Sequence, residues 1–116
     1  MKVAVVHTKD NVLSPLDLGE VISVVDTESK EIEQYENPGF ERVPGGKEIA
    51  TATIIRLKVD ALAVKSGGMC PGSYRMSQGR IKYIVSPFNE LEEFVEKIDS
   101  LDLTDELEPE VYAEYE

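Results

Sequence analysis

The chain has 116 residues and a formal net charge of −11, with 23 acidic side chains against 12 basic ones. This length suits one domain that buries roughly 65% of its unfolded surface. The first apolar run is too short for a signal peptide, and no run approaches the ~20 residues that span a bilayer. A single cysteine cannot form an internal disulfide, so we expect a cytoplasmic protein without a membrane segment.

The negative charge is concentrated at the C-terminal end. Residues 102–116 carry seven acids and no base, whereas residues 1–101 carry sixteen acids and twelve bases. Neither part has the basic stripe that binding to a phosphate backbone requires, so nucleic acid is not an expected partner. We expect one domain over residues 1–101, followed by an acidic tail.

The acidic tail, residues 102–116, could be disordered, solubilising or a docking segment. A charge run of this kind is most often simply solvated. Alternatively, the tail is a docking segment, because four of its residues could form one short amphipathic turn. These residues are Pro109, Val111, Tyr112 and Tyr115.

Three strands are predicted in the first part of the chain. Residues 1–6 have branched side chains at consecutive positions, which is typical of a strand covered on both faces. Residues 20–26 form a second apolar strand, and residues 31–36 form a third strand after a turn of polar residues. We expect these two strands to pair as a hairpin, with the more polar 31–36 at the edge of the sheet.

Helices and strands alternate in the second part. Residues 47–57 carry apolar side chains on one helical face, and residues 59–64 form a fourth strand. Residues 71–79 allow no more than two helical turns, and residues 81–85 form a fifth strand. Ser86 and Pro87 predict the start of a last helix, with Ser86 as its N-cap. The buried stripe of that helix is Leu91, Phe94, Val95 and Ile98.

The turn after the fourth strand holds the chain's only cysteine. It reads Gly67-Gly68-Met69-Cys70-Pro71-Gly72, and a parallel sheet places its ligand crevice at the end of such a strand. The only histidine, His7, ends the first strand. If the two strands are parallel neighbours, His7 and Cys70 point into one cleft.

Several short motifs resemble those of a known family, and their order and spacing carry the resemblance. The first strand and the segment from Ser14 to Leu18-Gly19 come first, followed by Val24-Val25-Asp26 and Asn37-Pro38. Further motifs are Gly45-Gly46, Val59-Asp60-Ala61-Leu62, Gly67-Gly68-Met69-Cys70-Pro71, Ile81-Lys82-Tyr83 and Glu90-Leu91-Glu92-Glu93. Over residues 1–101 the chain is thus similar to the dinitrogenase iron–molybdenum cofactor biosynthesis family, which includes NifX, NafY and the C-terminal part of NifB.

The resemblance implies an α/β fold of the ribonuclease H-like type. Such a fold has a five-stranded mixed sheet with one antiparallel strand and helices on both faces. It also implies a role as a non-enzymatic binding or carrier domain for an iron–sulfur or iron–molybdenum-type cofactor or precursor. A protein that donates or accepts the cofactor would then be the partner. Relatives often have glycine at the position of Cys70, so this thiol is a feature of the present chain.

The expected cofactor cleft is formed by the first loop and the glycine-rich turn. Thiolate and imidazole suit iron–sulfur species, which makes Cys70 and His7 the candidate metal ligands. One cysteine and one histidine cannot complete a structural zinc site, which favours a preassembled cluster over a bare ion. The candidate cofactor-binding residues are His7, Ser14, Gly67, Gly68, Met69, Cys70 and Gly72.

Less specific interpretations stay open for the same residues. Cys70 could be an inert residue that fills a turn, His7 could bond to loop backbone, and Met69 could be a packing residue. The glycines could serve the turn alone, or could form a nest for an anion. The alternative function is therefore a family member without an established role, which binds a small anionic ligand or a protein partner without metal. No catalytic constellation is visible, so an enzyme is not expected.

Overall fold

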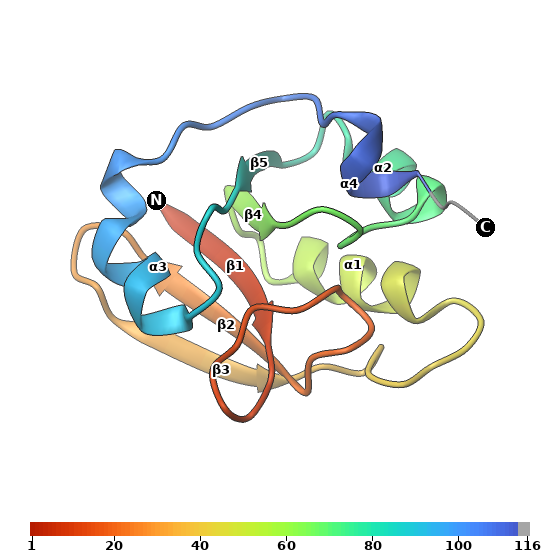
Figure 1. Ribbon diagram of the computed structural model, residues 1–116, viewed down its shortest axis with the longest axis horizontal. Coiled ribbons are helices and arrows are strands. Elements are labelled where there is room, and N and C mark those ends of the chain that lie inside the picture. The colour runs from red at the N-terminus through yellow and green to blue at the C-terminus, as the bar shows by residue number, and fades with distance from the viewer. Residues whose placement is uncertain (114–116) are drawn as a thin grey trace.

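The computed structural model describes residues 1–113 as an α/β fold around a five-stranded mixed sheet (Figure 1). In chain order the strands are β1 (Lys2–His7), β2 (Val21–Asp26), β3 (Ile32–Glu36), β4 (Ala61–Val64) and β5 (Lys82–Val85). The helices are α1 (Gly46–Arg56), α2 (Pro71–Ser77), α3 (Leu91–Lys97), the 3-10 helix Ile98–Ser100 and α4 (Pro109–Tyr112). The order of elements predicted from the sequence is confirmed up to α3.

The pairing of the strands corrects the expected fold class. In the spatial order β3-β2-β1-β4-β5, β2 pairs antiparallel with both of its neighbours, whereas β1–β4 and β4–β5 are parallel. The tight turn between β2 and β3 permits only antiparallel pairing, and helical crossovers permit the parallel pairs. Two of the four pairings are thus antiparallel. The pairings support an α/β fold with a five-stranded mixed sheet, and the expected ribonuclease H-like fold is not supported.

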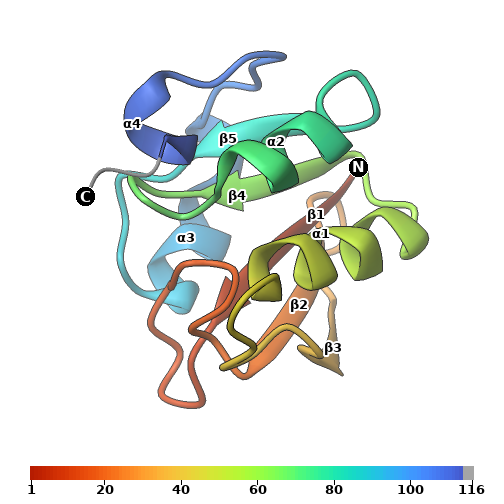
Figure 2. The same cartoon turned by 90° about the vertical axis from the view of Figure 1, so that its right-hand side faces the viewer.

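Helices cover both faces of the sheet, as Figures 1 and 2 show from two directions. Alternate residues of β1 point to opposite faces because the side-chain period of a strand is two. Ala4 and Val6 pack with residues of α1, α2 and α4, whereas Val3 and Val5 pack with residues of α3. The domain therefore has two apolar layers, one on each side of the sheet.

The last long helix starts later than the sequence predicts. Ser86 does not cap a helix; its hydroxyl accepts a hydrogen bond from the Phe88 N–H at 3.0 Å. The backbone between Ser86 and α3 forms hydrogen bonds with the loop that follows β1. The Leu13 N–H donates to the Asn89 carbonyl, and the Leu91 N–H donates to the Asn11 carbonyl. Because this backbone is engaged outside a helix, α3 begins only at Leu91.

The C-terminal segment is packed onto the domain through residue 113. We call residues 102–113 the C-terminal strap; residues 114–116, and with them Tyr115, lie outside the described residues. Leu107 and Val111 are 6% and 1% exposed and belong to the core layer of α1 and α2. This part of the tail is therefore not simply solvated, and the proposed short helical turn exists as α4.

The C-terminal strap also covers one edge of the sheet. The Tyr83 N–H donates to the Thr104 carbonyl at 2.8 Å, and the Thr104 N–H donates back to the Tyr83 carbonyl at 2.9 Å. The Tyr83 side chain is fully buried, and burial raises the pKa of its phenol. The strap thus closes the edge of β5, which would otherwise be open to other strands.

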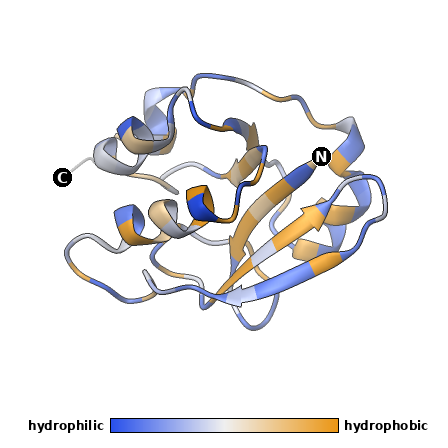
Figure 3. Cartoon of the chain, turned by 180° about the vertical axis from the view of Figure 1, so that it is seen from behind, coloured by the Kyte–Doolittle hydropathy of each residue, from blue (hydrophilic) through white to orange (hydrophobic). Residues whose placement is uncertain are grey.

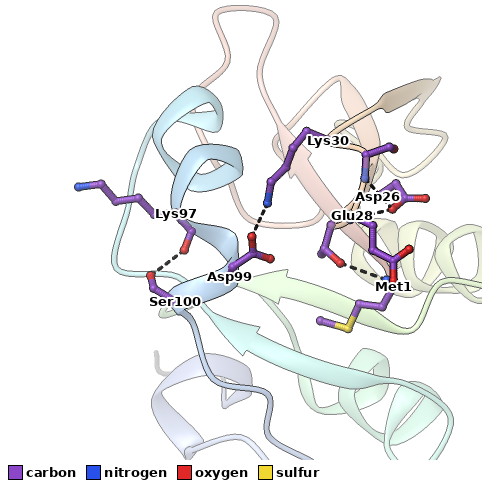
Figure 4. A network of polar contacts seen from close by, with 9 residues as sticks. Met1, Asp26, Glu28, Lys30, Lys97, Asp99 and Ser100 are labelled. Atoms are coloured by element: carbon purple, nitrogen blue, oxygen red, sulfur yellow. Dashed lines mark hydrogen bonds and ion pairs between the residues drawn. The ribbon is translucent and has the colours of Figure 1, made fainter.

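Polar contacts also join the β2–β3 turn to the segment that follows α3 (Figure 4). The Lys30 ammonium lies 2.7 Å from the Asp99 carboxylate, which joins the β2–β3 turn to the 3-10 helix. Within that turn, hydrogen bonds from the backbone N–H groups of Glu28 and Ser29 lower the pKa of Asp26. The Lys30–Asp99 ion pair is exposed, so we expect it to contribute about 1 kcal/mol or less.

No helix among the described residues has the length and apolar character needed to cross a membrane.

Candidate functional site

The candidate site is a cavity of about 380 Å³ between the starts of α1 and α2. The chain leaves β1 toward β2 and leaves β4 toward β5, so the loops after these neighbouring parallel strands diverge and leave a crevice. The Leu16 N–H donates to the Gly68 carbonyl at 3.0 Å and thereby joins the two loops. We call the adjoining space the Cys70 cavity; it is lined by Asp17, residues 42–48, Cys70, Pro71 and Gly72.

Cys70 holds a fixed position as the N-cap of α2. Its sulfur accepts a hydrogen bond from the Ser73 N–H at 3.4 Å, and its own N–H donates to the Ser73 hydroxyl at 2.9 Å. The thiol donates to Glu48 Oε1 at 3.0 Å. Glu48 would therefore be the acceptor of the thiol proton if the sulfur bound a metal, since thiolate is the ligating form.

The start of α1 presents positive charge to the same cavity. Gly45, with φ +95°, stands at the N-cap without a side-chain hydrogen bond. Among residues 1–113, the backbone N–H groups of Lys47 and Glu48 have no hydrogen-bond acceptor. Arg42 and Lys47 also line the cavity. Free N–H groups at a helix start favour an anion, although the carboxylates of Asp17 and Glu48 oppose part of this effect.

Of the predicted cofactor-binding residues, the structure brings only Cys70 and Gly72 to this cavity. Gly67, Gly68 and Met69 lie in the supporting turn behind it. The Gly67 N–H donates to the Glu110 carbonyl at 2.9 Å, and the Met69 N–H donates to the Val111 carbonyl at 3.1 Å. Met69 is 1% exposed and packs in the core, in agreement with its interpretation as a packing residue.

His7 does not share a cleft with Cys70. It follows Val6 in β1 and therefore points to the α3 face of the sheet, whereas the Cys70 cavity lies on the α1 face. The His7 ring is buried, with Nδ1 2.8 Å from the Thr8 carbonyl and Nε2 2.6 Å from the Ser23 hydroxyl. Because a carbonyl oxygen only accepts, Nδ1 is the donor in the first of these bonds, and in the neutral ring Nε2 then accepts from the Ser23 hydroxyl.

Ser14 lies inside the first loop and away from the lining of the Cys70 cavity. Its hydroxyl is buried and has no hydrogen-bond partner within the described residues. The neighbouring Gly19 is required there, because a Cβ at position 19 would lie 2.7 Å from the His7 carbonyl oxygen. Ser14 and Gly19 thus pack the loop closely against β1.

Sequence reasoning did not single out the charged residues that line the cavity, which are Asp17, Arg42, Lys47 and Glu48. The paired glycines at the start of α1 were the available signal, because they mark a close approach of backbone to a neighbouring group. No group of three or more His, Cys, Asp or Glu side chains within residues 1–113 could hold a metal ion.

No protein-family model matches the chain, and no curated protein matches it. Several solved structures, however, match the chain. The apo form of the orange protein from Desulfovibrio gigas is 15% identical with a TM-score of 0.73, covering 89% of this chain and 92% of that chain. A candidate NifB protein from Thermotoga is 16% identical with a TM-score of 0.66, covering 92% and 96%. The chain has the fold of these proteins.

A third structure agrees with the first two. It is a candidate dinitrogenase from Methanocaldococcus jannaschii, 14% identical with a TM-score of 0.64, covering 92% of this chain and 97% of that chain. A fold related to nitrogenase proteins is thus established for nearly the whole chain. Identities this low show the fold alone, so function has to be argued from the Cys70 cavity.

Proposed function

We propose that this chain is a non-enzymatic binding or carrier domain for an iron–sulfur or iron–molybdenum-type cluster or its precursor. The observation that carries the proposal is a single thiol, fixed at the start of a helix, that opens into a cavity of about 380 Å³ lined by Arg42 and Lys47. The nitrogenase-related names of two structural neighbours, and the apo form of the third, support this class of cargo. Membership of the dinitrogenase cofactor biosynthesis family belongs to the same proposal.

The cavity suits a cargo that is released again. One thiolate gives one bond to an iron atom, and a preassembled cluster brings its remaining ligands with it. The N–H groups of Lys47 and Glu48 and the side chain of Arg42 would then stabilise the negative charge of the cluster. A protein that donates or accepts the cluster is the expected partner, because a single protein ligand leaves the other iron atoms accessible.

The replacement Cys70→Ser tests the sulfur directly. Serine keeps a capping side chain for the Ser73 N–H, so α2 should persist while the soft ligand is lost. We expect at least a tenfold loss of bound iron after anaerobic loading with an iron–sulfur or iron–molybdenum cluster. The loss is measured by visible absorption and metal analysis of the desalted protein.

Two outcomes of this experiment separate the candidate functions. Equal loading of Cys70→Ser and the unchanged protein would refute ligation by Cys70. A colourless protein after loading would favour the alternative, in which the same cavity holds a small anion without metal. The N–H groups at the start of α1 favour that alternative specifically, because they serve any anion of suitable size.

Removing the cationic side chains should weaken an anionic cargo in either case. We expect Arg42→Gln and Lys47→Gln to raise the dissociation constant by about two- to fivefold each at low salt, as is usual for exposed charge pairs. The effect should shrink at high ionic strength. Arg56→Gln, at the opposite end of α1, is the matched control. Equal effects of all three would indicate a response to net charge rather than to the cavity.

A further inference from the structure

The outer edge of β3 is open, whereas the outer edge of β5 is covered by the C-terminal strap. The Asp26 N–H donates to the Glu31 carbonyl, and the Asn37 N–H donates to the Glu20 carbonyl, both at 2.9 Å. These two bonds fix which β3 residues bond inward, because bonded and non-bonded pairs alternate in an antiparallel ladder. The backbone groups of alternate β3 residues therefore point outward, and none has a partner among residues 1–113. The outward residues are Ile32, Gln34 and Glu36.

An apolar groove runs beside this open edge. A cavity of about 540 Å³ lies between β3 and α3, with Ile32, Leu91 and Val95 among its lining residues. Ile32 is 39% exposed. Figure 3 shows β3 at the border of the sheet, mostly hydrophilic and next to the hydrophobic β2. An additional strand at this edge would place alternate side chains over the groove.

The negative charge around the β3 edge indicates which kind of segment could bind there. Glu92 and Glu96 line the groove one helical turn apart, while Lys30, the cation at its end, is already paired with Asp99. Glu31, Glu33 and Glu36 add exposed carboxylates along the strand. An extended segment with basic side chains is complementary to this surface, and an acidic one is repelled.

A second copy of this chain does not satisfy these conditions. Antiparallel pairing of two β3 strands about Gln34 would set the Glu36 side chain of each copy opposite the apolar Ile32 of the other. It would also bring together two molecules with a formal net charge of −11 each. The like charges would lie along both sides of the new ladder, where they oppose association.

We propose that β3 and the adjoining groove dock an extended basic segment of a partner protein by strand addition. The backbone groups of Ile32, Gln34 and Glu36 form the new ladder, and the groove takes an apolar side chain of the segment. This docking surface lies on the α3 side and the β3 edge of the domain, away from the Cys70 cavity. Its test therefore does not depend on whether the cavity holds a cluster.

The test uses a seven-residue peptide of alternating lysine and valine with blocked ends, added to the full chain. We expect amide signals of Ile32, Gln34 and Glu36 to shift in two-dimensional NMR spectra. A peptide of alternating glutamate and valine should produce no such shifts. The decisive variants are Gln34→Pro and Gln34→Ala.

This pair of variants is matched, because both lose the side-chain hydrogen bond from Gln34 to Ser23. Only proline also removes the outward N–H, and proline is tolerated at an edge strand where that N–H faces solvent. We expect Gln34→Pro to bind the lysine peptide at least fivefold more weakly than Gln34→Ala. If Gln34→Pro does not fold, the double variant Glu92→Lys, Glu96→Lys replaces it, since both side chains are exposed. It should weaken binding by at least the same factor.

Three results would overturn the proposal. Equal binding by both Gln34 variants would remove the backbone ladder from the interaction. Shifts confined to the acidic residues of the C-terminal strap would assign the peptide to non-specific charge attraction. A concentration-dependent dimer that Gln34→Pro abolishes and Gln34→Ala retains, detected by sedimentation, would assign the edge to a second copy.

Discussion

Replacing both Leu107 and Val111 by alanine is expected to lower the free energy of unfolding by about 4 kcal/mol. Both side chains are buried in the layer between the sheet and helices α1 and α2. For a domain of this size the loss corresponds to a melting temperature lower by roughly 10 °C or more. Thermal and urea unfolding, followed by circular dichroism, measure the change.

The matched control is Leu103→Ala in the same strap. Leu103 is 41% exposed, so its truncation should change stability by about 0.5 kcal/mol or less. If the C-terminal strap were only a solubilising tail, the double variant would be as stable as this control. A stable double variant would therefore contradict the packing of the strap.

The replacement of Leu107 and Val111 by alanine should also increase the mobility of the candidate site. The strap accepts hydrogen bonds from the N–H groups of Gly67 and Met69 and so fixes the turn that precedes Cys70 in the sequence. Tyr112 of α4 stacks on Tyr74 of α2, with ring centroids 4.1 Å apart. In the double variant we therefore expect faster hydrogen exchange at Gly67 and Met69, and faster alkylation of Cys70, at temperatures where the domain is still folded.

The strap also shows where composition misleads. Its acids suggest solvation, but the two apolar residues four positions apart, Leu107 and Val111, are the ones that pack. Two such residues give too short a pattern for a periodicity argument. Whether they are buried depends on the surface offered by Tyr74 and Met69, which only the folded chain assembles.

The apolar strands were predictable because their runs are bounded by turn residues, and the more polar β3 was predictable from the turn that joins it to β2. The placement of His7 was only half predictable. Because His7 directly follows Val6 in a strand, the side chains of His7 and Val6 point to opposite faces of the sheet. The sequence does not reveal which face the short helix after β4 covers, so the separation of His7 from Cys70 could not be foreseen. Likewise, Ser86 has the local pattern of an N-cap, yet pairing of the following loop with residues 11–13 delays the helix.

Phe94→Ala is the second replacement with a large expected effect, about 3–5 kcal/mol of unfolding free energy. Phe94 is fully buried and anchors α3 on the face of the sheet opposite the Cys70 cavity. Phe88, which is only partly buried under the Lys97 ammonium, offers a matched control. Phe88→Ala should cost about 1–2 kcal/mol, because less of its ring leaves water on folding.

Comparing Phe94→Ala, on the α3 face of the sheet, with the strap variant, on the α1 face, also tests whether the two faces are coupled. Phe94→Ala and the double variant of the strap are expected to destabilise the chain by similar amounts. Only the strap variant should change the alkylation rate of Cys70 or the loading of the cavity below the unfolding transition. A Phe94→Ala protein with altered Cys70 chemistry at such temperatures would show that the two layers are coupled through the sheet. Unchanged Cys70 chemistry would mean that α3 and the β3 edge can engage a partner without disturbing the Cys70 cavity.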